Sequence, residues 1–234
     1  MSRDVASALT PRAPAWVENG ARLSGARANA VVTINPFEHE RRMQAHLGAV
    51  TDLALLDLFL TLPQGWPVAT TALNPEDWDH LRRAPRGCWT GDHGVDIVRV
   101  LQRPCQVETV VVDGDRWHKS LETARRFAAA APVVVRTPAD ARVDSSMLWA
   151  AQLLGIGVWQ VEGADHRVLV APEVPPGGVV KAAKWRFEEW AYRQWLTTTG
   201  LANRAQRAGL IAPCRSSGYF ATRPNCERSL KVSD

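Results

Sequence analysis

Carboxylates at the ends of two expected strands are the side chains of this chain with the clearest chemistry. Asp96 lies in the β-branched run 95–101, and Asp113 and Asp115 follow the next such run. Carboxylates on adjacent strand ends can hold a divalent cation such as Mg²⁺, which polarises a phosphate and activates water. Lys119, a few residues later, would stabilise the developing negative charge. We therefore expect a metal site made by Asp96, Asp113 and Asp115, with Asp96, Asp113 and Lys119 in catalytic roles.

The elements that must position these residues follow from periodicity and capping signals. Two runs of β-branched residues, joined by Arg103-Pro104, predict adjacent strands. Asp144 is a typical N-cap for the helix expected after it, and Glu162-Gly163-Ala164-Asp165 is typical of a hairpin turn. The pattern predicts an α/β fold with a mixed central sheet flanked by helices. The expected strands are 95–101, 107–112, 133–135, 157–161 and 167–170, and the expected helices of this part are 118–130 and 145–154.

From Asp96 to Glu173, this order of elements resembles the PD-(D/E)XK nuclease-like family, the restriction-endonuclease core. The resemblance matches Asp96 to the first acid of the family motif and Asp113 to the second. Asp115 stands where the family has lysine, so Lys119 or Glu122 on the following helix would take that role, and Lys119 is the residue expected to be catalytic. The resemblance implies a nuclease-like core over residues 91–173, Mg²⁺ as cofactor and DNA, in preference to RNA, as partner. The alternative interpretation is a plain Asp-Gly turn and an exposed helix face.

Three further regions surround this core. Residues 1–35 show little periodicity and are expected to form an irregular N-terminal arm, and residues 36–90 to form a helical region. Residues 179–234 are expected to form a basic, aromatic helical segment, since residues 181–234 carry ten Lys/Arg against four Asp/Glu. Such a charge excess suits a polyanion, although a solvated tail would also explain it. The expected nucleic-acid-binding residues are Lys181, Lys184, Arg186, Arg193, Arg204 and Arg207.

Helix 181–196 is expected to pack onto the core. Phe187 and Trp190 lie on one face at helical spacing, together with Ala183 and Ala191. An isolated helix of this length is marginal in water, so burial against other elements must hold it.

Two other functions compete with a nuclease-like activity. Helices 53–62 and 75–83, with the strands around Cys88-Trp89 and 95–101, could form a winged helix-turn-helix of a non-catalytic DNA-binding or regulatory protein. Its recognition helix would begin with two acids, Glu76 and Asp77, which are unfavourable against DNA. The third possibility is a phosphohydrolase that uses the pair Asp113-x-Asp115, which resembles the haloacid-dehalogenase type.

Composition excludes some classes of protein. No apolar run reaches the roughly 18 residues that a membrane helix needs, and no signal-type segment is present, so a cytoplasmic location is expected. The four cysteines are scattered without zinc-site spacing and are expected to be reduced and mostly buried. The oligomeric state stays open.

Overall fold

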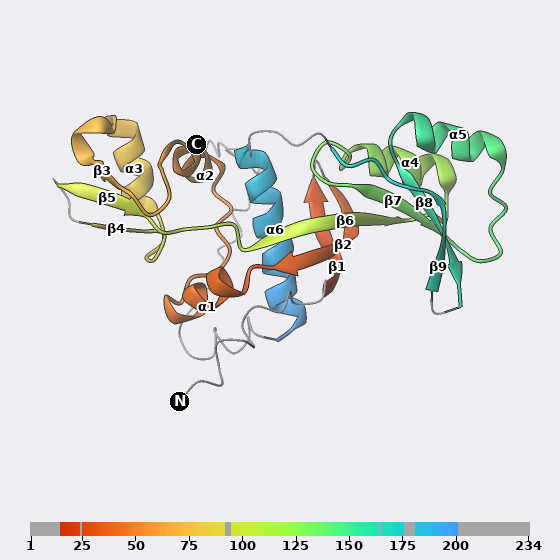
Figure 1. Cartoon of the computed structure of the whole chain (residues 1–234), viewed down its shortest axis with the longest axis horizontal. Helices are drawn as coiled ribbons and strands as arrows, with labels where there is room; N and C mark the ends of the chain where they lie inside the picture. The colour runs from red at the N-terminus through yellow and green to blue at the C-terminus, as the bar shows by residue number, and fades with distance from the viewer. Residues whose placement is uncertain (1–14, 24, 92–94, 164, 176–180, 201–234) are drawn as a thin grey trace, which may run out of the picture.

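A six-stranded mixed sheet forms the centre of the protein (Figure 1). The computed structural model describes residues 15–23, 25–91, 95–163, 165–175 and 181–200. The strand order is β1-β2-β6-β7-β8-β9, with β6, β7 and β8 parallel and the outer pairs antiparallel. This confirms the predicted α/β class with a mixed sheet flanked by helices. The strands are β1 (Ala15–Leu23), β2 (Ala26–Ile34), β6 (Cys105–Asp113), β7 (Val133–Thr137), β8 (Gly157–Glu162) and β9 (Asp165–Val170).

Short polar side chains start most of the described helices, as the sequence predicted for Asp52, Asn74 and Asp144. The side chains of Asn35, Asp52, Asn74 and Asp144 each accept a hydrogen bond from the backbone N–H three residues later. Such caps depend only on local chain geometry, so they can be predicted from the sequence. The helices are α1 (Pro36–Gln44), α2 (Leu53–Thr61), α3 (Pro75–Arg83), α4 (Trp117–Arg125), α5 (Ser145–Leu153) and α6 (Ala182–Thr198), with a short 3₁₀ turn, η2 (Thr70–Ala72).

The prediction of an irregular arm over residues 1–35 is wrong for residues 15–34. They form the β1–β2 hairpin, and β2 pairs with β6 in the central sheet. The inward positions of β2 are Ala28, Ala30, Val32 and Ile34, all buried. Alanine is a weak strand former, so half of this alternation gives little sequence signal. Residues 1–14 lie outside the described part of the chain.

The prediction that run 95–101 pairs with run 107–112 is also wrong. β5 (Asp96–Arg99) lies in a separate three-stranded sheet, between β3 (Pro67–Ala69) and β4 (Trp89–Gly91). Both edges of β5 are therefore taken, and β6 pairs with β2 and β7 instead. Strand-forming residues predict that a strand exists, but the choice of partner depends on segments that are distant in sequence.

Helix α6 joins two hydrophobic cores. One core lies between the six-stranded sheet and helices α4 and α6, and the other is formed by α2, α3 and the smaller sheet. Figure 1 shows the smaller sheet with α2 and α3 at one end of the molecule, β7–β9 with α4 and α5 at the other, and α6 between them. Phe187 and Tyr192 belong to the first core and Trp185 to the second.

The predicted packing of this helix is confirmed, but the expected apolar face is only partly right. Phe187 and Ala191 are buried, whereas Trp190 is half-buried and Ala183 is exposed. Because α6 contacts a core on two sides, its buried positions do not form the single stripe that sequence spacing suggests.

A buried ion-pair network ties α6 to α1. The Arg42 guanidinium donates to both carboxylate oxygens of Glu189, each at 2.7 Å, and to Glu38 Oε1 at 2.6 Å. Burial alone would lower the pKa of Arg42, but Glu189 and Glu38 outweigh it and raise that pKa. Glu189 also accepts from the Val50 N–H at 2.8 Å and from Trp185 Nε1–H at 3.1 Å. Every member is thus hydrogen-bonded, which is what burial of charge requires.

Two cysteines of the described chain, Cys88 and Cys105, are buried and not disulfide-bonded, as expected. Burial raises the pKa of Cys88 to about 12 and that of Cys105 well above its ordinary value. Because the thiolate is the reactive form, we expect both thiols to resist an aromatic disulfide reagent at pH 8. The measurement uses the Cys214→Ser/Cys226→Ser variant, and guanidinium-unfolded protein serves as the control with two reactive thiols. Rapid reaction of folded protein would contradict the buried placement.

Candidate functional site

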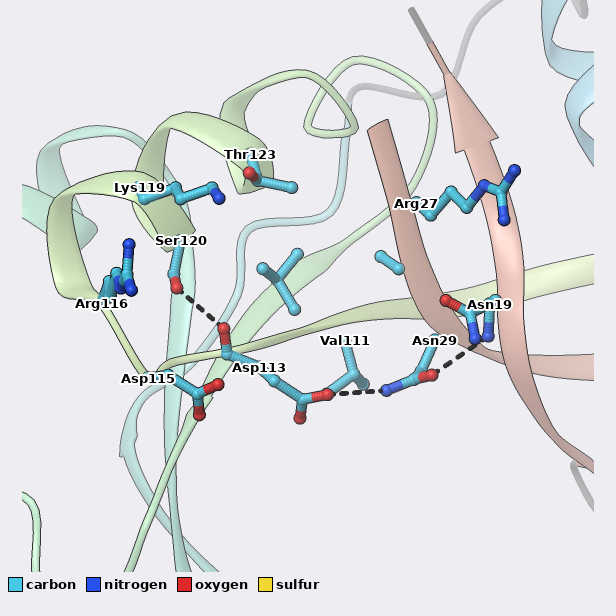
Figure 2. Close-up of a pocket in the computed structure, with 12 residues that line it drawn as sticks. Asn19, Arg27, Asn29, Val111, Asp113, Asp115, Arg116, Lys119, Ser120 and Thr123 are labelled. Atoms are coloured by element: carbon cyan, nitrogen blue, oxygen red, sulfur yellow. Dashed lines mark hydrogen bonds between the residues drawn. The ribbon is translucent and has the colours of Figure 1, made fainter. Parts of the chain in front are cut away.

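A cavity of about 450 Å³ lies where the β1–β2 hairpin, the end of β6 and α4 meet. Figure 2 shows Lys119, Ser120 and Thr123 of α4 on one side and the hairpin residues on the other, with Asp113 between them. Its polar lining is mixed in charge. It comprises Asn19, Arg27, Asn29, Asp113, Asp115, Arg116, Lys119, Ser120 and Thr123.

The turn after β6 holds α4 over the end of the strand. Ser120 Oγ donates to the Asp113 carbonyl at 2.7 Å, and the Gly114 N–H donates to the Arg136 carbonyl at 2.8 Å. A side chain at position 114 would begin only 2.9 Å from that carbonyl oxygen, so the close approach of β6 and β7 here requires glycine. Asp113 and Lys119 therefore line the same cavity, as the sequence predicted for this pair.

Both oxygens of the Asp113 carboxylate already have protein partners. Arg136 donates to Oδ1 from Nε at 3.0 Å and from Nη2 at 2.6 Å, and Asn29 Nδ2 donates to Oδ2 at 3.2 Å. The Arg136 guanidinium also lies over the Trp16 ring, 5.1 Å from its centroid. Asp113 is therefore neutralised by an arginine from the neighbouring strand, which disfavours both metal binding and nucleophilic attack by this carboxylate.

Asp96 does not reach this cavity. It lies at the start of β5 in the smaller sheet, whereas Asp113 ends β6 in the larger one. The shared site expected for Asp96, Asp113 and Asp115 therefore does not form, because its strands are not neighbours. Across the described residues, no group of three or more His, Cys, Asp or Glu side chains is placed to hold a metal ion. Mg²⁺ is usually held by one or two carboxylates together with waters and substrate phosphates. The carboxylates at this cavity are Asp115 and Asp113, and Asp113 is paired with Arg136.

The hairpin supplies cavity residues that sequence reasoning missed. Asn29 Oδ1 accepts from the backbone N–H of Asn19, whose φ of 50° lies in the left-handed region that asparagine tolerates. Arg27 follows the turn at Gly25, where φ is +78°. The signal that could have found them is the Gly25 turn followed by apolar residues at every second position from Ala28 to Ile34.

A second cavity of about 400 Å³ lies between the β1–β2 turn and α6. Arg22, Arg27 and Arg186 line it, and no carboxylate does. Trp190 forms part of its wall and holds two guanidinium groups, those of Arg22 at 5.7 Å and of Arg193 at 5.3 Å from the ring centroid. Because Arg27 lines both cavities, the two are neighbours at the hairpin.

Five basic side chains around these cavities make no salt bridge within the described chain. They are Arg22, Arg27, Arg116, Lys119 and Arg186. Arg42 and Arg136, by contrast, are paired with carboxylates: Arg42 with Glu38 and Glu189, and Arg136 with Asp113. We call these five residues the basic strip.

Some of the basic residues predicted after residue 180 belong to the basic strip or lie next to it. Arg186 belongs to it, and Arg193 contacts it through Trp190. Lys181 and Lys184 are exposed at the beginning of α6. Arg204 and Arg207 lie outside the described residues.

The segment from α2 to β5 contains the helices and strands from which a winged helix was expected, with β3 as a further strand. β3 precedes α3, β4 and β5 follow it, and the sheet order is β3-β5-β4. The exposed start of α3 is acidic, and its two arginines bond within the helix: Arg82 pairs with Asp79, and Arg83 Nε donates to the Asp79 carbonyl at 2.8 Å. Residues 92–94, most of the expected wing, lie outside the described residues.

Comparisons with protein-family models, curated proteins and solved structures found no match to this chain. Within the described residues, no helix is long and apolar enough to cross a membrane.

Proposed function

We propose that this protein binds nucleic acid, with DNA favoured over RNA, along the basic strip, and that its nuclease-like core does so without metal-dependent cleavage. The single observation that carries the proposal is that Arg27 joins two cavities whose other cations have no carboxylate partner. An unpaired guanidinium or ammonium group at a surface cavity is available to a phosphate at little desolvation cost, and arginine matches phosphate oxygens with two parallel N–H donors.

The polar lining of the first cavity suits contacts beyond phosphate. Asn19, Asn29, Ser120 and Thr123 offer amide and hydroxyl groups next to Arg27 and Lys119. Such groups can bond to sugar and phosphate oxygens and fix the register of a strand. The described part of the C-terminal region adds Lys181 and Lys184 nearby in sequence to Arg186.

The absence of cleavage follows from the partners of Asp113. A metal ion at this carboxylate would have to displace Arg136, which approaches it from two nitrogens. Both side chains are more than a third exposed, so losing this contact would cost only about 0–1 kcal/mol, and the larger obstacle is the missing second ligand. Asp96, the other predicted ligand, lies in the three-stranded sheet and cannot supply a second carboxylate to a metal ion at Asp113.

The non-catalytic winged-helix function is the second candidate, because the sheet order β3-β5-β4 around α3 favours it. Against it, the basic residues of α3 already bond to Asp79, and the helix begins with Glu76 and Asp77. DNA would meet an acidic helix end at this surface. We therefore propose the strip, and not α3, as the DNA-binding surface.

The test measures fluorescence anisotropy of a labelled DNA duplex at several salt concentrations. Each phosphate contact contributes about −0.9 to the slope of log affinity against log salt. We expect Arg27→Ala/Lys119→Ala to weaken binding and to make the slope less steep by about 2. The matched variant Arg82→Ala/Arg83→Ala removes the same charge from α3 and is expected to leave both quantities unchanged.

Three outcomes would contradict the proposal. Loss of affinity only in the Arg82/Arg83 variant would assign binding to the winged helix. No measurable binding by the wild-type chain would remove the function altogether. Cleavage of the duplex in Mg²⁺ or Mn²⁺ that disappears in Asp113→Ala would restore the metal-dependent nuclease, whereas affinity unaffected by EDTA supports binding alone.

A further inference from the structure

The cavity between the β1–β2 turn and α6 differs from its neighbour in charge. Three guanidinium groups line it, from Arg22, Arg27 and Arg186, and none of its lining residues is acidic. The neighbouring cavity, in contrast, contains Asp113 and Asp115 beside its cations. The second cavity is therefore the more strongly anion-attracting of the two.

The backbone that carries the three cations of this cavity is ordered before any ligand arrives, and one of the guanidinium groups has a ring contact. The Arg22 guanidinium lies over Trp190, and Trp190 is itself flanked by Arg193. Arg186 lies on α6, one residue before the buried Phe187, and Arg27 lies on β2 directly after the turn. Two strands and a packed helix thus fix the three side chains at their bases, which lowers the entropy lost on binding.

We infer that this cavity binds the terminal phosphate of a nucleic-acid strand, an inference that rests on the proposed function. A phosphodiester inside a strand carries one negative charge, whereas a terminal phosphate monoester carries about −1.5 to −2 near pH 7. Three cations without a carboxylate match the monoester better. The half-buried Leu23 and Trp190 give the cavity an apolar wall against which the sugar of the end nucleotide can pack.

The position of Arg27 sets the direction in which the nucleic-acid strand would run from its terminal phosphate. Since Arg27 lines both cavities, a strand whose terminal phosphate occupies the second cavity would place its next phosphates toward Arg27, Lys119 and Arg116 of the first. The basic strip would then recognise the end of a nucleic-acid strand and not an arbitrary internal segment.

The test compares labelled oligonucleotides of one sequence that carry a 5′-phosphate, a 3′-phosphate or hydroxyls at both ends. We expect one phosphorylated form to bind about tenfold more tightly than the hydroxyl form, the size of one charge-assisted contact. Arg186→Ala should remove this difference and Arg186→Lys should retain part of it, because lysine keeps the charge but not the two parallel donors. Arg167→Ala, on the exposed strand β9, serves as the charge-matched control and should keep the full difference.

The outcomes separate this inference from the function on which it rests. Equal affinity for all three oligonucleotides, with salt dependence and loss of binding in the Arg27/Lys119 variant intact, would overturn the terminal-phosphate site alone. A phosphate preference that survives in Arg186→Ala and in a second variant, Arg22→Ala, would also overturn it. No binding of any oligonucleotide would instead overturn the proposed function.

Discussion

The Glu189→Ala variant is expected to lose about 3–5 kcal/mol of unfolding free energy, among the largest effects of any single substitution in this protein. The substitution leaves the buried Arg42 guanidinium without its two-oxygen partner and leaves the Val50 N–H without an acceptor. Glu38 would then be the one carboxylate left to Arg42, beside the carbonyls of Gly48 and Gln102. A loss of this size is a large part of the 5–15 kcal/mol typical of a domain. Urea unfolding followed by circular dichroism measures it.

The adjacent residue provides a matched control. Glu188 is also buried, but its partner Arg103 is 34% exposed and can be solvated when the carboxylate is removed. Glu188→Ala is therefore expected to cost less than Glu189→Ala. Equal losses in the two variants, or a loss below about 1 kcal/mol for Glu189→Ala, would show that the network does not hold α1 and α6 together.

Trp185→Ala is expected to cost a further amount of similar size, about 3–5 kcal/mol, when measured alone. Trp185 is buried in the core formed by α2, α3 and the smaller sheet, with Arg99 5.7 Å from its ring centroid. Truncation leaves a cavity and removes the N–H that donates to Glu189. Trp190→Ala, five residues later, should cost only about 1–2 kcal/mol because its ring is half-buried at the second cavity.

Thermal or urea unfolding of the two tryptophan variants checks the contrast. Trp185→Phe separates packing from hydrogen bonding, since it keeps a buried ring and is expected to lose only about 0.5–1.5 kcal/mol with the N–H, plus a packing adjustment. Because Trp185 and Glu189 are in contact, the losses of Trp185→Ala and Glu189→Ala should not add fully in the double variant. Stability equal to wild type in Trp185→Ala would place the ring at the surface.

Most local elements of this fold could be predicted from the sequence. Asp52, Asn74 and Asp144 predict helix starts because each bonds to a backbone N–H only three residues away. The apolar run at Val133 predicts a strand covered on both faces, and β7 is buried in the middle of the sheet. Lys119 was expected near Asp113 because only one turn separates strand and helix, and both line one cavity.

The partners of distant segments could not be predicted in this way. Asp96 and Asp113 lie on strands that are neighbours in sequence but belong to different sheets. The edge of β6 is taken by a hairpin from much earlier in the chain, where Asn29 pairs with Val111. Arg27, Asn29 and Arg136 reach the candidate site through the same pairings.

The sequence by itself therefore determined most of the secondary structure after residue 35, three of the helix caps and the charge excess after residue 180. The tertiary structure decided which charges meet. It placed Arg136 on Asp113, buried Arg42 against Glu189, and left Arg22, Arg27 and Arg186 around a cavity without an acid. The physical reason is range: a cap or a turn depends on bonds within a few residues, whereas strand pairing is selected by burial of the whole sheet face, to which every distant segment contributes.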